Sequence, residues 1–265
     1  MENEASRGAL EKGIDVLVAL GEYPQGVGVS QLSRSTGLPI STVHRLLGIL
    51  ASSGFVRFEQ ESRQYTLGLR VFELAQKVSL ARSLSEVALP VMRRLVKELG
   101  EPSLLSVPDG LEMVFIERVE GWRRIQIRGT VGERGPLYCT SLGKSLVAFM
   151  PEEEREDLIR RLELKKIAPN TITDPDELRA ELELTRRRGY GIADEEREEG
   201  VRSLGAPILG SRGKPIAAVC ISVPVFRVSR EALEEFAPLV QRAAAEIGVQ
   251  VVDGSNVESG ERERG

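Results

Sequence analysis

Side chains suited to nucleophilic or acid–base chemistry are few in this sequence. Its 265 residues contain one histidine, His44, and two cysteines, Cys139 and Cys220. Ser–His–Asp and Cys–His chemistry needs an imidazole beside the nucleophile, and a histidine-based zinc site needs several. The cysteines are far apart and form no CxxC pair, which argues against a zinc knuckle or a redox dithiol. We therefore interpret both cysteines first as small buried apolar residues.

An enzyme would have to use Cys139 or Cys220 as a nucleophile, or Asp194 as an acid–base group. No imidazole lies outside the first 80 residues, and the sequence has no P-loop, GxSxG motif or cluster of metal ligands. The sequence therefore predicts a protein that is not an enzyme and that uses neither a metal nor a cofactor.

A polar helix face near the N-terminus offers a different chemistry, contact with DNA. A helix expected from Ser41 to about residue 52 has valine and leucines on one side and Ser41 and Arg45 on the other, flanked by Thr42 and His44. Short hydroxyl side chains let a helix enter a major groove about 12 Å wide, where an arginine reaches a guanine edge or a phosphate. This face predicts a recognition helix, with His44 more suited to touch a phosphate or solvent than a base.

Two further helices are expected before this one. The first has apolar residues at helical spacing, with Ser6 as its N-cap and Gly21 at its end. The second covers residues 31–36, with Ser30 as its cap and Gly37 as a left-handed stop. Two short helices joined by a glycine-containing turn are the pattern of a helix-turn-helix.

A hairpin expected from strands at 55–58 and 65–67 makes this domain winged. It would place Arg57 and Arg63 where phosphates pass, although Glu59 and Glu61 argue against deep insertion. The open alternative is a protein-interaction domain, in which an arginine on a polar helix face is simply solvated.

The composition is that of an ordinary globular chain, with 41% hydrophobic and 29% charged residues. The length suggests two domains. A formal net charge of −4 with no polybasic block means that DNA binding is predicted from pattern and not from charge. No run approaches the roughly 18 apolar residues of a membrane span, and the N-terminus is acidic, unlike a signal peptide. We expect a cytoplasmic protein without a membrane partner.

Past the hairpin, a helical period through about residue 80 predicts a linker helix. Strands, then helices, then strands beside a terminal helix predict a mixed α/β sandwich on an antiparallel sheet. The helices are expected at 84–99, 141–150, 152–161, 175–188 and 230–249, and the strands at 103–107, 112–119, 125–128, 201–209 and 216–223.

Ordered segments along the chain closely resemble IclR-type transcriptional regulators. The N-terminal ones are ALEKGIDVL (9–17), LPISTVHRLL (38–47) and YTLG (65–68), and the later ones are ERVEG (117–121), GKSLVAF (143–149), TITD (171–174), RGYG (188–191) and EGVR (199–202). The likeness covers roughly residues 7–248. One departure is Ile40, which is often lysine or another polar residue in relatives, so a phosphate contact there is expected to be missing.

The resemblance implies an α+β protein. A winged helix-turn-helix DNA-binding domain (1–68) and a linker helix (69–83) precede a GAF/profilin-like effector-binding and oligomerisation domain (84–250), and the tail (251–265) is expected to be disordered. It also implies a repressor or activator of a catabolic operon that binds double-stranded operator DNA as a homodimer or dimer of dimers. In this family the linker contributes to dimer contact.

The resemblance further implies a site for a small organic acid or phenol in the C-terminal domain. A helix expected to start at Ser141 offers free N–H groups and a positive dipole end to an anion. In relatives, positions on this helix line the effector pocket and polar residues face it. The predicted effector-binding residues are Ile127, Ser141, Leu142, Asp194, Ser203, Cys220 and Ser222.

Plainer interpretations stay open for these residues. A serine at a helix start is usually only a cap, Cys220 fits a core, and Asp194 fits a solvated acidic loop. A further alternative is a constitutive DNA-binding dimer whose C-terminal domain only oligomerises, with Leu142 and Tyr138 filling the pocket.

Overall fold

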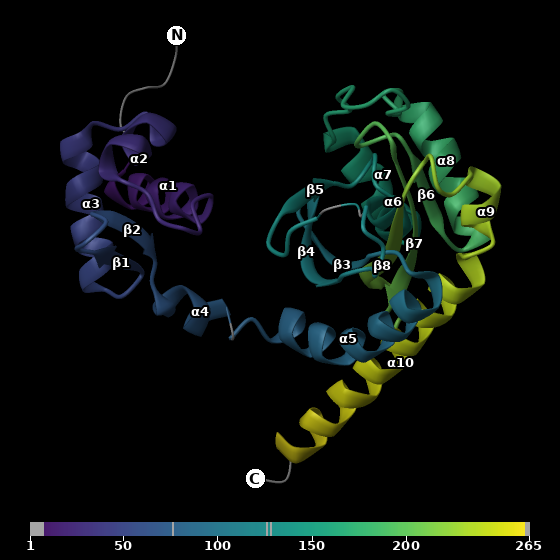
Figure 1. Ribbon diagram of the computed structural model, residues 1–265. Coiled ribbons are helices and arrows are strands. Elements are labelled where there is room, and N and C mark those ends of the chain that lie inside the picture. Colours follow the sequence, from purple (N-terminus) through teal and green to yellow (C-terminus); the bar gives the residue numbers. More distant parts are fainter. Residues whose placement is uncertain (1–7, 76, 126, 128, 263–265) are drawn as a thin grey trace. The chain divides into compact units, whose positions relative to one another are not determined.

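The chain divides into two compact units, Met1–Ser79 and Leu80–Gly265, which are described separately (Figure 1). The structure, a computed structural model, describes residues 8–75, 77–125, 127 and 129–262. No helix of the described chain is long and apolar enough to cross a bilayer.

The first unit is a three-helix domain with a hairpin. Its elements are α1 (Ala9–Gly21), α2 (Val29–Thr36), α3 (Ile40–Ser52), β1 (Val56–Glu59) and β2 (Gln64–Leu67). The helices pack through fully buried side chains such as Val16, Leu32, Val43 and Leu47. The two strands pair antiparallel, with Arg57 opposite Thr66. The apolar period of α3 therefore turns its polar side outward, as the sequence predicts.

Two helix starts differ from expectation. α2 begins at Val29, with Gly28 at its N-cap and no side-chain cap, so Ser30 is inside the helix and does not cap it. Its end at Gly37 has the expected left-handed backbone, with φ of 69°. Ser6, the predicted cap of α1, lies outside the described residues, and Gly8 occupies the N-cap position.

The predicted linker helix is interrupted. Helix α4 covers Leu69–Ala75, and α5 covers Ser79–Leu99. Between them, the Lys77 and Val78 amides donate to the carbonyls of Leu74 and Ala75 in turns. The segment 69–83 thus comprises α4, a turn and the start of α5.

The second unit is built on one antiparallel sheet of six strands in the order β5-β4-β3-β8-β7-β6 (Figure 1). The strands are β3 (Ser103–Asp109), β4 (Glu112–Val119), β5 (Arg134–Pro136), β6 (Gly191–Asp194), β7 (Val201–Leu209) and β8 (Pro215–Pro224).

Helices cover both faces of this sheet. One layer contains α5, α9 (Arg230–Glu234) and α10 (Ala237–Arg262), and the other contains α6 (Ser141–Ala148), α7 (Glu152–Arg161) and α8 (Pro175–Arg188). Alternation along each strand sends successive side chains to opposite layers. Val219 and Ile221 belong to the α5/α10 core, whereas Ala218 and Cys220 belong to the α6 core.

Three details depart from the predicted elements. Ile125 and Ile127 lie outside strands, residues 126 and 128 are not described, and the sheet edge is β5 instead. The short strand β6 was not predicted. The predicted last helix is two helices, α9 and α10, and α10 continues past Val249 through Arg262, so disorder over 251–265 stays a prediction.

Candidate functional site

The outer side of α3 is a candidate DNA interface. Ser41, His44 and Arg45 are exposed and Thr42 is half-buried. The side chains of His44 and Arg45 make no ion pair or hydrogen bond within the described part of the first unit. Their donors are therefore available to an incoming partner.

The hairpin adds two exposed arginines. The Arg57 side chain is 74% exposed, and its guanidinium lies 3.6 Å from the carboxylate of Glu59, two residues further along the same strand. Arg63 is in the hairpin turn with a left-handed backbone, φ 52°. Such an exposed ion pair is worth at most about 1 kcal/mol, so Arg57 can exchange Glu59 for another anion.

In the second unit, a cavity of about 110 Å³ lies where α6 begins against the sheet. It brings together six of the seven predicted effector residues: Ile127, Ser141, Leu142, Ser203, Cys220 and Ser222. Leu104, Met113 and Phe115 complete its apolar wall.

The sheet register explains why the polar residues converge. Ser203 on β7 is directly opposite Ser222 on β8, and Cys220 lies between Leu104 and Gly205. Because strand side chains alternate, Cys220 and Ser222 share the α6 face.

The start of α6 is fixed on this face by hydrogen bonds and close packing. Thr140 caps the helix by accepting from the Gly143 amide at 3.0 Å. The Ser145 hydroxyl lies 2.7 Å and 2.8 Å from the carbonyl oxygens of Ser141 and Gly205, and it accepts from the Gly191 amide. A Cβ on Gly191 would lie 2.6 Å from the Ser141 carbonyl oxygen, closer than real Cβ contacts, so a glycine at this position lets the helix approach β6 this closely.

A buried ion-pair network adjoins the cavity. The Lys144 side chain is 1% exposed, and its Nζ lies 2.7 Å from Glu196 Oε1 and 3.3 Å from Glu181 Oε1. Arg188 also pairs with Glu181, at 2.8 Å. Glu196 itself lines the cavity. Its backbone carbonyl accepts from the Thr171 hydroxyl at 2.6 Å, which holds this loop in place.

Two oxygens around this cavity are buried without an oxygen or nitrogen partner in the described chain, Ser141 Oγ and Glu196 Oε2. The Cys220 thiol, a weak hydrogen-bonding group, lies beside the Ser141 side chain. Burial raises the pKa of the Glu196 carboxyl, and the Lys144 charge opposes that rise. Buried polar groups are normally satisfied, so these two oxygens point to a missing hydrogen-bond partner.

The cysteines lie close to this cavity as neutral thiols. Burial raises the pKa of Cys139 to about 12 and that of Cys220 to about 11. Neither is a thiolate near neutral pH, which removes the basis of the nucleophile interpretation.

Asp194 is the predicted residue that the structure does not bring to the cavity. Its carboxylate accepts from Arg202 Nε at 2.6 Å, beside the cavity-lining Ala193. Tyr138 does not fill the cavity either, because its hydroxyl donates to the Lys165 carbonyl at 2.8 Å. The filled-pocket alternative named Leu142 and Tyr138, and of these only Leu142 lines the cavity.

Sequence reasoning missed Glu196 and Arg197. The Arg197 guanidinium lies over the Phe115 ring and donates to Glu133 Oε1 at 2.6 Å. A signal for Glu196 was present, since Lys144 is in an otherwise uncharged, buried helix and a buried lysine requires an acidic partner.

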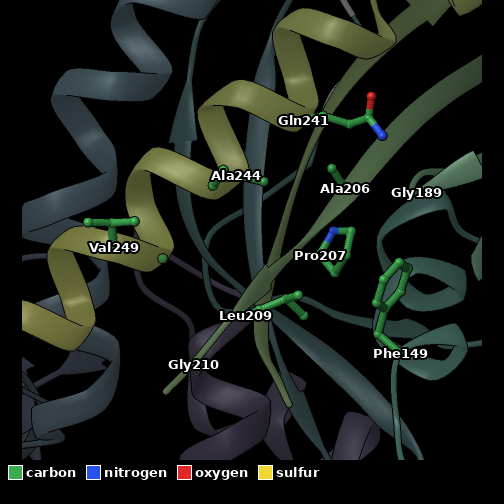
Figure 2. A pocket seen from close by; sticks show the side chains of 11 residues that line it. Phe149, Gly189, Ala206, Pro207, Leu209, Gly210, Gln241, Ala244 and Val249 are labelled. Atoms are coloured by element: carbon green, nitrogen blue, oxygen red, sulfur yellow. The ribbon is translucent and has the colours of Figure 1, made fainter. Parts of the chain in front are cut away.

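A second hollow, of about 540 Å³, lies between α10 and β7 (Figure 2). Ala244 and Val249 of α10 line one side, and Pro207, Leu209 and Phe149 line the other. Although it is larger, no charged side chain lines it, and none of the predicted effector residues does. We therefore place the candidate effector site at the smaller cavity.

Two family models match the chain. "IclR helix-turn-helix domain" matches residues 9–60, and "Bacterial transcriptional regulator IclR C-terminal" matches residues 57–249.

Curated relatives and solved structures agree with this match. The chain is 34% identical to the HTH-type transcriptional regulator KdgR of Escherichia coli over 240 residues, 89% of each chain. It is 31% identical to the transcriptional repressor IclR of the same bacterium, covering 90% of this chain and 88% of the repressor. The Thermotoga maritima IclR structure has a TM-score of 0.76 and 33% identity, covering 91% of this chain and 98% of that one.

A ligand-bound structure is also similar. It is an IclR homologue from Microbacterium hydrocarbonoxydans complexed with 4-hydroxybenzoate, with a TM-score of 0.81 and 29% identity, covering 92% of this chain and 99% of that one. With a helix-turn-helix unit, a cavity-bearing α/β unit and matches along nearly its whole length, the chain belongs to the IclR family of bacterial transcriptional regulators.

Proposed function

We propose that this regulator binds operator DNA with residues 1–68 and senses a small organic acid or phenol with residues 84–250, thereby controlling a catabolic operon in the cytoplasm. The main support for the ligand-sensing role is the cavity at α6, where Ser141 and Glu196 of the lining have buried oxygens, Ser141 Oγ and Glu196 Oε2, without an oxygen or nitrogen partner in the described chain. A similar protein whose structure contains 4-hydroxybenzoate supports this ligand class.

In the DNA complex, α3 enters the major groove, where Ser41, Thr42 and Arg45 contact base edges. His44 touches the flanking phosphates, and Arg57 and Arg63 of the hairpin contact the phosphates beside the groove. All six side chains are exposed or half-buried, which supports this assignment.

The DNA-binding form is a homodimer or a dimer of dimers on a pseudo-palindromic site. Exposed apolar residues on α1 and α4 support self-association: Leu10, Ile14, Val18, Leu69 and Phe72 are each more than half exposed. Exposed apolar surface of this kind marks interaction sites.

For the effector to act, it must bind one DNA-binding arrangement more tightly than another, typically by about 1–3 kcal/mol, and DNA must change effector affinity by the same factor. The test compares wild type with Ser222→Trp, which fills the cavity. Calorimetry with small carboxylates and phenols should detect a ligand for wild type only, and operator affinity without ligand should be equal in the two proteins.

If no acid or phenol binds the wild type, or if the Ser222→Trp protein responds normally, the sensor assignment fails. The constitutive dimer, whose C-terminal unit only oligomerises, would then be the better account.

A further inference from the structure

The cavity at α6 has an uneven distribution of hydrogen-bonding groups. Among the groups of the lining residues, the Ser141 and Leu142 amides, at the first turn of α6, make no backbone hydrogen bond in the described chain, and Arg197 lies nearby. Glu196, which also lines the cavity, has a buried acceptor without a partner, Oε2. A ligand that satisfies both the amides and Oε2 must carry an acceptor and a donor.

The volume limits the size of that ligand. An engineered apolar cavity of about 150 Å³ binds benzene. At about 110 Å³, this cavity is smaller, so it suits an acid of a few carbon atoms better than an aromatic ring.

The charge of Lys144 limits which donor group the ligand can carry toward Glu196. Lys144 Nζ already lies 2.7 Å from Glu196 Oε1 and supplies the positive charge that the buried carboxylate needs. An ammonium group at Oε2 would be a second buried cation close to Lys144, and like charges repel strongly in a buried site. A neutral hydroxyl satisfies Oε2 without that repulsion.

We propose that Glu196 determines specificity in this cavity by accepting a hydrogen bond from the hydroxyl of a short aliphatic hydroxy acid, whose carboxylate lies at the first turn of α6. This inference rests on the proposed sensor function and narrows its ligand class. The corresponding keto acid should bind more weakly, because its carbonyl oxygen is an acceptor and cannot donate a hydrogen bond to Glu196 Oε2.

The experiment compares lactate with pyruvate, and glycolate with glyoxylate, by calorimetry on the full-length protein. Wild type should bind each hydroxy acid roughly 10-fold or more tightly than its keto acid, as expected when a buried polar group is left unpaired. Equal binding, or tighter binding of the keto acids, overturns the role of Glu196 but leaves the sensor function standing. Binding of none of the four overturns the hydroxy-acid assignment, and the wider panel of acids and phenols then decides the sensor function.

The Glu196→Gln variant tests the proposal through a change in ligand preference, which a simple loss of structure would not produce. Lys144 is a donor only, so it retains the amide oxygen, and the amide NH₂ faces the cavity. The preference should therefore invert, with pyruvate bound more tightly than lactate. Glu199→Gln, an equal charge change at an exposed residue of the same loop that does not line the cavity, is the matched control and should keep the wild-type ratio. An unchanged ratio in Glu196→Gln overturns the proposal, and if that variant does not fold, the wild-type ratio decides alone.

Discussion

The Lys144 ammonium and one oxygen of the Glu196 carboxylate lie 2.7 Å apart with both side chains almost completely buried. This pair joins the first turn of α6 to the loop after β6. The second oxygen of the same carboxylate is buried without a partner in the described chain, and Glu196 lines the cavity. One residue thus takes part in both the packing of the domain and its candidate ligand site.

Removing one member of this pair should destabilise the second unit strongly. Lys144→Met leaves Glu196 buried without its main counter-charge, and breaking a buried pair from one side costs about 3–5 kcal/mol. The double variant Lys144→Met/Glu196→Leu should recover most of that loss. Urea unfolding, followed by the fluorescence of Trp122, the sole tryptophan of the chain, measures the free energy of unfolding of the single and the double variant. Additive losses in the double variant would contradict this account.

The same carboxyl should give a distinctive pH dependence. Its folded pKa is raised by burial, so the folded protein holds this proton more tightly than the unfolded chain, whose ordinary value is 4.5. The stabilising effect is complete below that value and is lost as pH rises through the folded pKa. Wild type should therefore lose stability relative to Glu196→Gln between about pH 4.5 and the raised pKa. A constant difference across this range would contradict the prediction.

Arg45→Ala should weaken operator binding by about 1–3 kcal/mol and relax the preference at one base pair, if the guanidinium contacts a guanine. Fluorescence anisotropy with the DNA upstream of the regulator's own gene measures the affinity. Arg93→Ala, at an exposed arginine of α5, is the control and should bind like wild type. Equal affinities for wild type and Arg45→Ala would remove Arg45 from the interface.

The hairpin arginines should contribute equally to the binding of DNA of any sequence. Arg57→Ala and Arg63→Ala should each weaken binding to all duplexes alike and reduce the salt slope by roughly one unit per lost phosphate contact. Titrations at several salt concentrations test this. A loss of specificity with an unchanged slope would mean that the hairpin contacts bases.

Both cysteines should be nearly inert in the folded protein. With pKa values raised to about 12 and 11, Cys139 and Cys220 are protonated at neutral pH and shielded from reagents. Reaction with a disulfide reagent near pH 8 should be about 100-fold or more slower than in urea. Rapid labelling of the native protein would show that the cavity opens widely.

Local patterns predicted much of this fold. The apolar period of α3, the acidic start and basic end of α7, and the Asp174 cap with Pro175 at the start of α8 are signals carried by neighbouring residues. The edge strands were harder, because β5 and β6 are three and four residues long and are defined by pairing with distant partners. The interruption between α4 and α5 was not predicted, because the helical spacing of apolar residues continues across it.

The candidate site was predictable only in part. Ser203, Cys220 and Ser222 converge through strand register, which a single sequence does not encode in any local pattern, and their grouping came from the family resemblance. Asp194 is the last residue of β6, and Glu196 follows two residues later in an acidic loop. Which of them reaches the cavity depends on the left-handed backbone at Glu195 and on the ion pairs with Arg202 and Lys144.

The contacts of the Ser145 hydroxyl have a consequence for binding energetics. They fix the α6 start to β6 and β7 through backbone atoms before any ligand arrives. A ligand that binds there does not have to order this helix turn, so little of its interaction energy is offset by lost conformational entropy. A molecule of only a few heavy atoms, with few contacts to offer, gains measurable affinity most readily from such a preorganised surface.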